Sequence, residues 1–149
     1  MSKENEAIIA RWFEEVWNQR RTETIDELFA ANGIAHGLSD EGPITPESFK
    51  VLHQAFLNAF PDIKVTILDT FSDSDKVVAM CSVSGTHEGD GLGIAASNKR
   101  FEITGTAIVR VEGGKIVEAW NHFDFLNLYR QIDAITPDNK ETPRLHGLP

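Results

Sequence analysis

ITGTAIVRVEGGKIVEAW, residues 103–120, predicts two strands joined by a turn of two residues. Gly113 and Gly114 form the turn, because both central positions of a type I′ hairpin require positive φ, which glycine adopts without strain. Apolar residues alternate with other residues on both sides of the turn, as is typical of half-buried strands. The sequence therefore predicts an antiparallel hairpin in which Glu112 lies opposite Lys115.

A regular ladder extended from this turn predicts which side chains share a face of the sheet. It pairs Ala107 with Trp120, Gly105 with His122 and Ile103 with Asp124. The face that holds these residues is the more apolar one, so we expect it to point inward. Gly105 and Ala107 are small, so they leave room beside Trp120 and His122 for a bound molecule.

Asp124 has two interpretations at the end of this hairpin. It is a favoured N-cap for a short helix over DFLNLYRQI, residues 124–132. It also shares the predicted inner face, where burial would raise its pKa into the range that general acid/base catalysis uses. The two roles are compatible, and the pattern alone leaves both open.

The rest of the chain predicts helices first and strands afterwards. Apolar residues at helical spacing predict helices over 4–18, 22–31 and 46–60, the last with Thr45 as N-cap and Pro46 at its first position. Residues 33–45 are rich in helix breakers and predict an irregular or edge segment. Period-two patterns predict strands at about 62–71, 76–88, 99–112 and 115–123. We therefore expect one α+β domain over residues 1–149, with helices on a curved antiparallel sheet and an extended tail from about 136.

Composition excludes several classes of function. The chain has 149 residues, a net charge of −9 and a pI near 4.9, which disfavour nucleic acid as a partner. Cys81, the single cysteine, cannot form an internal disulfide and indicates a reducing compartment. The sequence shows neither a secretory signal nor an apolar run long enough to span a membrane. We expect a cytoplasmic protein that does not bind membranes.

Several stretches together resemble the SnoaL-like polyketide cyclases, also called ester cyclases, of the nuclear-transport-factor-2-like superfamily. They are FAANGIAHG, AFPDIKVTI, VSGTHEGDGLGI, ITGTAIVRVEGGKIVEAW and the closing FD and LYRQI, within residues 26–132. The resemblance implies a cone-shaped α+β barrel with a hydrophobic pocket and association into homodimers or homotetramers. It also implies cofactor-independent chemistry on a small hydrophobic, polyketide-like carbonyl compound, by aldol cyclisation or isomerisation.

The resemblance implies roles for particular residues. Asp124 matches the family's general acid/base by its position after the tryptophan, and His36 matches a pocket histidine. The expected substrate-binding residues are Trp12, Phe56, Phe60, His87, Arg110, Trp120 and His122. Arg110 matches a family arginine, although the regular ladder turns it outward, and only a bulge would bring it in. GIAASNKR, residues 93–100, departs from the family's pattern near the pocket mouth, so the substrate does not follow from the resemblance.

The same residues also fit other functions. We expect no metal site, because the five histidines show no His-x-His or HExxH spacing. A non-catalytic binding module would use the same hollow for an apolar ligand. A hydrolase, in which Asp124 activates water, is a third and weaker interpretation.

Overall fold

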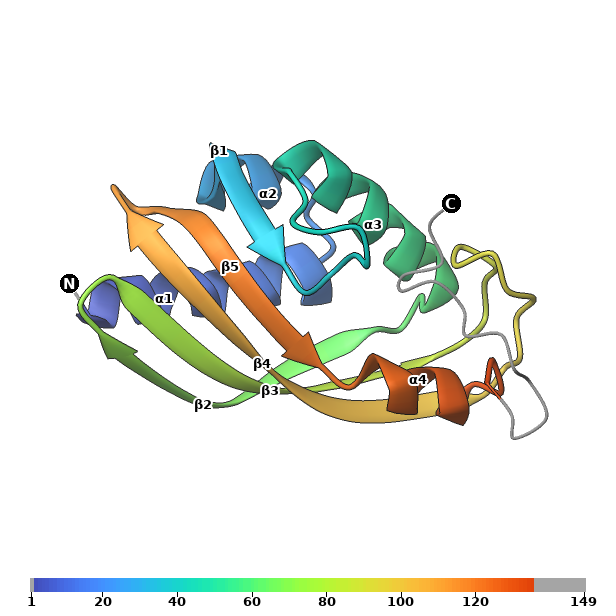
Figure 1. Ribbon diagram of the computed structural model, residues 1–149. Helices are drawn as coiled ribbons and strands as arrows, with labels where there is room; N and C mark the ends of the chain where they lie inside the picture. Colours follow the sequence, from blue (N-terminus) through green and yellow to red (C-terminus); the bar gives the residue numbers. More distant parts are fainter. Residues whose placement is uncertain (1, 136–149) are drawn as a thin grey trace.

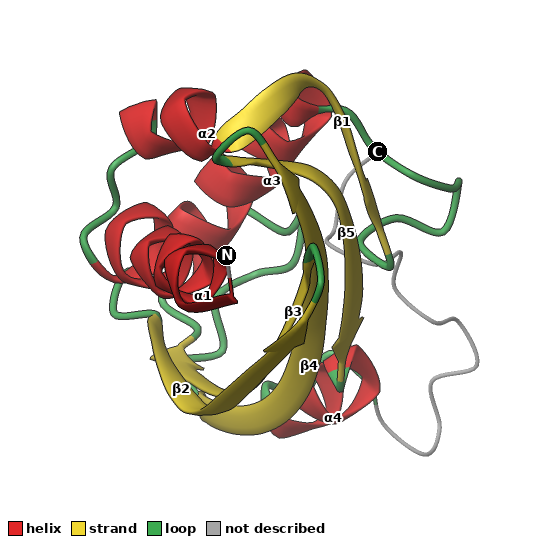
Figure 2. Ribbon diagram, turned by 90° about the vertical axis from the view of Figure 1, so that its left-hand side faces the viewer, coloured by secondary structure: helices red, strands yellow, loops and turns green. Residues whose placement is uncertain are grey.

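The computed structural model describes residues 2–135 and contains a five-stranded sheet in the order β1-β5-β4-β3-β2. The strands are β1 (Phe29–His36), β2 (Lys64–Asp73), β3 (Lys76–Thr86), β4 (Arg100–Glu112) and β5 (Lys115–Phe123). The helices are α1 (Ser2–Arg11), η1 (Trp12–Asn18), α2 (Glu23–Leu28), α3 (Pro46–Ala59) and α4 (Phe125–Gln131). The sheet curves around α1 and α3 (Figures 1 and 2), so the predicted arrangement of helices on a curved sheet is confirmed. The tail from 136, including His146, lies outside the described residues.

Four strands form the predicted antiparallel meander. Gly113 and Gly114 have φ values of +59° and +79°, and Glu112 pairs with Lys115 across them. β2 and β3 are joined by a second tight turn, in which Asp73 pairs with Lys76. The hairpin predicted at Gly113-Gly114 is therefore confirmed.

A β-bulge lies two residues beyond the Gly113-Gly114 turn. β4 advances by one residue, from Val111 to Arg110, while β5 advances by two, from Ile116 to Glu118. Val117 is thus an extra residue in β5. Because side chains alternate between faces, one extra residue inverts every position that follows it.

The predicted register beyond the turn was wrong for this reason. The observed pairs are Ile108 with Trp120, Ala107 with Asn121, Thr106 with His122 and Gly105 with Phe123. β4 keeps its predicted inner face, and Ala107 and Val109 are buried. In β5 the inner face instead holds Ala119, Asn121 and Phe123, and it turns Trp120 and His122 outward.

Phe123 occupies the space that Gly105 leaves. A Cβ atom at Gly105 would lie 2.2 Å from Phe123 Cδ2 and 2.8 Å from Phe123 Cα. An aromatic ring that covers a glycine on the neighbouring strand restores the packing that the missing side chain would give. The space beside Gly105, which the sequence predicted to be free for a bound molecule, is therefore filled by the Phe123 ring.

β1 was not predicted as a strand. Ala35 and His36 pair with Ala119 and Trp120 in parallel, so the sheet is mixed and not wholly antiparallel. α2 ends at Leu28, three residues before the predicted boundary, and β1 follows at once. The short polar and glycine residues of this segment hide its strand character, and its partner is remote in the sequence.

The first predicted helix is α-helical at its start and π-helical at its end. After Arg11 the chain follows a π-helix, η1, in which Gln19 N donates to Glu14 O at 2.8 Å. The third predicted helix begins as expected, because Thr45 Oγ1 accepts a hydrogen bond from Ser48 N at 3.3 Å.

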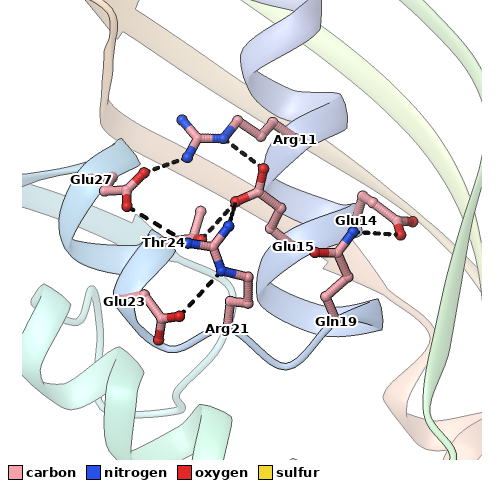
Figure 3. A network of polar contacts seen from close by, with 8 residues as sticks. All are labelled: Arg11, Glu14, Glu15, Gln19, Arg21, Glu23, Thr24 and Glu27. Atoms are coloured by element: carbon pink, nitrogen blue, oxygen red, sulfur yellow. Dashed lines mark hydrogen bonds and ion pairs between the residues drawn. The ribbon is translucent and has the colours of Figure 1, made fainter.

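A polar network fastens η1 to α2 (Figure 3). Glu15 receives hydrogen bonds from Arg11 Nε at 2.7 Å, Arg21 Nη1 at 2.8 Å and Thr24 Oγ1 at 2.8 Å. Hydrogen bonds from Arg11 and then Thr24 lower the pKa of Glu15, and the positive charges of Arg11 and Arg21 act in the same direction. The network holds η1 against α2.

No helix among the described residues is long and apolar enough to cross a membrane.

Candidate ligand-binding site

An apolar cavity lies between the helices and the inner face of the sheet. Its volume is about 80 Å³, and a neighbouring hollow adds about 30 Å³. The cavity is lined by Trp12, Phe13, Trp17, Leu38, Phe49, Leu52, Phe56, Ile63, Val65, Val83, Phe101, Ile103, Asn121, Phe123, Phe125 and Leu128. None of these side chains is ionisable.

The aromatic wall comes from η1 and α3. The rings of Trp12 and Phe49 have centroids 5.2 Å apart, and Trp17 meets Phe56 edge-on at 6.2 Å. His53 supports this wall from behind, because its Nε2 donates to Val16 O at 2.7 Å. π-Helical segments leave main-chain carbonyls without their α-helical partners, and this hydrogen bond satisfies one of them.

Asn121 is the polar residue of the cavity apart from the two indoles. The bulge at Val117 turns its side chain inward, and Nδ2 donates to the main-chain oxygen of His36 at 3.0 Å. The end of β1 packs closely here: Gly37 has φ +83°, and a Cβ atom on it would lie 2.0 Å from Asn121 O. The amide is therefore held in one orientation at the cavity wall.

Asp124 does not face this cavity. Its side chain is exposed and caps α4, with Oδ1 accepting from Asn127 N at 3.1 Å. The predicted N-cap is confirmed, whereas the expected desolvated carboxylate on the inner face was wrong. The inverted register puts Asn121 inward and leaves the carboxylate at the strand end, beside Phe123 and Phe125, which do line the cavity.

His36 and Trp120 lie on the outer face of the sheet. Their rings stack with centroids 5.6 Å apart, and His36 Nε2 lies 2.7 Å from Glu118 Oε2. The hydrogen bond from His36 lowers the pKa of Glu118, and a longer one from Arg110 acts in the same direction. The expectation that His36 and Trp120 face the pocket was therefore wrong.

Arg110 points outward, as the regular ladder predicted for β4. Its guanidinium bonds Glu112 and approaches Glu118 Oε1 at 3.4 Å. A bulge in β4 would have turned Arg110 inward. The bulge lies in β5 instead, so Arg110 stays on the outer face. This outward position of Arg110 does not support the expected contact with a ligand in the pocket.

A shallow trough crosses the same outer face, and it holds His122 and Asp124. Leu68, Met80, Thr104, Thr106 and Leu126 also line it. His122 was expected beside Gly105 on the inner face and instead lies opposite Thr106. The trough and the cavity share Asn121, Phe123 and Phe125, so a wall of these residues separates them.

His87 and Phe60 are buried but do not line the cavity. His87 Nδ1 accepts from Ser97 N at 3.2 Å, and its ring lies 5.7 Å from that of Phe60. Burial lowers the pKa of His87. Both residues anchor the loop 87–99, and of the expected binding residues the cavity brings together only Trp12 and Phe56.

The cavity also contains residues that the sequence did not single out. Asn121, Phe123 and Phe125 were missed because the bulge leaves no clear signature in the sequence. The sequence did contain one hint of the bulge. The regular ladder placed Glu118 beside buried valines on the inner face, where an unpaired carboxylate is costly. Within residues 2–135, no group of three or more His, Cys, Asp or Glu side chains lies close enough together to hold a metal ion.

The family model of the SnoaL-like polyketide cyclases matches residues 7–132. The chain belongs to this family. A comparison with curated protein sequences finds no match.

Solved structures share the cyclase fold over most of their length. IdmH, a proposed polyketide cyclase from Streptomyces antibioticus, is 28% identical, with a TM-score of 0.75 over 87% of this chain and 98% of that one. A proposed polyketide cyclase from Bacillus cereus is also 28% identical, with a TM-score of 0.76 over 89% and 83% of the two chains. AclR, a proposed hydroxylase from Streptomyces galilaeus, is 20% identical with a TM-score of 0.82 over 94% and 87%, which supports the fold alone. The expected nuclear-transport-factor-2-like fold is confirmed.

Proposed function

We propose that the inner cavity is the small-molecule site of this cyclase-family protein, and that its ligand is a small, uncharged, hydrophobic carbonyl compound. The observation that carries the proposal is the lining: aromatic and aliphatic side chains surround one oriented amide, with no ionisable group among them. Such a site favours neutral molecules, because an ion would lose its hydration without gaining a partner. A few polar groups in an apolar pocket are typical of small-molecule sites.

The three tryptophans of the chain give a direct test of binding. Trp12 and Trp17 line the cavity, whereas Trp120 stacks on His36 outside it. We expect 2-hydroxycyclohexanone to cause a saturable change in tryptophan emission that survives in W120F and is lost in the double variant W12F/W17F. A change that is lost in W120F, or no saturable change at all, would overturn the proposal.

Family membership favours cyclisation or isomerisation as the reaction, and Asp124 is the second part of the proposal. Asp124 would take a proton from the carbon α to a carbonyl, and the resulting enolate carbon would form a bond to a second carbonyl carbon. The proton would then return from Asp124 to the new alkoxide. Asp124 lies between Phe123 and Phe125, on the trough side of the wall that these two residues form against the cavity. The proposed role therefore requires the two rings to move aside so that the carboxylate can reach a ligand in the cavity.

D124N tests this role cleanly, because asparagine is as good an N-cap as aspartate and α4 should keep its start. The assay follows closure of heptane-2,6-dione to 3-hydroxy-3-methylcyclohexanone, which then loses water to give 3-methylcyclohex-2-enone, with D40N as a control at another exposed aspartate. We expect D124N to lose about 10²-fold or more in rate while binding is kept. Equal turnover would remove Asp124 from the mechanism. If the chain binds ligand but turns nothing over, it is a non-catalytic binding module.

Self-association completes the proposal. Leu68 and Met80 are 58% and 44% exposed on the outer face, and Leu126 of α4 is 48% exposed. All three line the trough, and large exposed apolar patches mark interaction surfaces. We expect a homodimer that covers this face, and M80E should shift it to monomer in sedimentation equilibrium. A wild-type chain that sediments as a monomer would contradict this.

A further inference from the structure

The two ends of the Asn121 amide are not equivalent. Nδ2 donates to the main-chain oxygen of His36 at 3.0 Å. A carbonyl oxygen only accepts hydrogen bonds, so the nitrogen end of the amide must face it. The amide oxygen is therefore turned away from His36.

The amide oxygen has no hydrogen-bond partner among the described residues. Two buried side-chain atoms of these residues lack a partner, His53 Nδ1 and His87 Nε2, and the oxygen of Asn121 is not one of them. It is therefore accessible rather than sealed in the core. Asn121 lines both the cavity and the neighbouring hollow, so its side chain lies at the boundary of the two.

This oxygen is the one side-chain acceptor among the residues that line the cavity. The other lining side chains are hydrocarbon, except for the indoles of Trp12 and Trp17, whose N–H groups only donate. A ligand without a donor would cover the oxygen and leave it unsatisfied, which costs about 1–3 kcal/mol. A hydroxyl or N–H group on the ligand would satisfy it.

We infer that the cavity selects neutral hydrophobic ligands that carry a hydrogen-bond donor, and that Asn121 Oδ1 is the atom that recognises it. The inference rests on the proposed function, because it names the ligand class of the same cavity. A hydroxy ketone, or a carbonyl compound in its enol form, belongs to this class. An all-carbon ligand or a simple ether does not.

The cavity is small for a ligand with one ring. Its two hollows measure about 80 and 30 Å³, which together is less than the roughly 150 Å³ of a cavity that holds benzene, so a one-ring ligand must move part of the lining apart. Phenol and toluene require the same movement, because they have nearly the same shape and differ in one hydroxyl group. In a purely apolar cavity toluene binds better, since the phenol hydroxyl gives up its hydration.

The experiment measures the affinities of both probes for the full chain and for N121L by titration calorimetry. We expect wild type to bind phenol at least as tightly as toluene. In N121L, which keeps the side-chain volume and removes the acceptor, the ratio should shift toward toluene by about tenfold or more, from one lost hydrogen bond and its desolvation. N32L, at an exposed position of β1, is the control and should leave the ratio unchanged. N121A removes the same acceptor and serves if N121L does not fold.

The possible results distinguish a failure of the selection by Asn121 from a failure of the proposed function. If both probes bind and the ratio is the same in N121L or N121A as in wild type, the selection by Asn121 is wrong while the cavity remains a ligand site. If wild type prefers toluene, the inference fails in the same way. If neither probe binds wild type, the proposed function fails and the inference with it.

Discussion

The side-chain amide of Asn121 donates to the main-chain oxygen of His36, 3.0 Å away, and this bond joins β5 to the end of β1 inside the apolar cavity. The contact exists because the bulge at Val117 inverts the strand. It places an uncharged polar group where a regular strand would have placed Trp120 and His122.

Replacing Asn121 with aspartate should make stability depend on pH. The new carboxyl group would face the oxygen of His36 in apolar surroundings, so its pKa in the folded state should rise above its unfolded value of roughly 3.9. A raised folded pKa means that the variant is most stable below pH 4 and loses stability as the pH rises through the folded pKa. Urea unfolding from pH 4 to 8 should show N121D losing about 1–3 kcal/mol relative to wild type over this range. A constant difference would show that the side chain reaches water.

Replacing Gly105 with alanine should destabilise the sheet. The new methyl group would lie 2.2 Å from the Phe123 ring and 2.8 Å from Phe123 Cα, so both the ring and the strand must shift. We expect a loss of about 1–3 kcal/mol, typical of overpacking. The double variant G105A/F123L should recover part of this loss, because it relieves the ring contact but not the main-chain contact. Unfolding in urea provides the measurement, and full stability of G105A would contradict the packing described.

His53 should contribute to acid sensitivity. Burial lowers its pKa, with the hydrogen bond to Val16 opposing and Arg20 adding to the shift. A lowered folded pKa means that its contribution is present above the unfolded pKa, roughly 6.5, and is lost as the pH falls below it. The free energy of unfolding should therefore fall between pH 6.5 and 5, and the slope should be smaller in H53Q. Since burial lowers the pKa of His87 as well, H87Q should remove a second part of the slope. An unchanged slope in H53Q would refute its role.

Thr24 should stabilise the junction of η1 and α2. Its buried hydroxyl donates to Glu15 Oε1 at 2.8 Å, so T24V keeps the shape and removes the donor. We expect a loss of about 0.5–1.5 kcal/mol. T22V, at a less buried threonine that accepts from Gln54 Nε2, should cost less, and the reverse order in urea unfolding would contradict the network.

Much of the fold could be predicted from local sequence. Gly113 and Gly114 fixed one hairpin, and the Thr45-Pro46 pair fixed the start of α3, because turns and caps depend on a few adjacent residues. β1 was missed because its parallel pairing with β5 is a long-range contact.

The site was harder to predict than the fold. A single bulge residue, Val117, exchanges the faces of β5, so an error of one position moved His122 and Trp120 into the cavity and Asn121 out of it. Trp12 and Phe56 do line the cavity, because a helical stripe tolerates such a shift. Residue-level predictions on a strand depend on register, and register depends on contacts that local patterns do not encode.

The most direct test of the inner cavity as the ligand site is an NMR titration of the isotope-labelled protein with phenol. The account predicts that the indole N–H signals of Trp12 and Trp17 and the side-chain amide of Asn121 shift together with one dissociation constant. The indole of Trp120, outside the cavity, should stay in place. Shifts of Trp120 and His122 with unmoved cavity signals would place the ligand on the outer face and contradict the account.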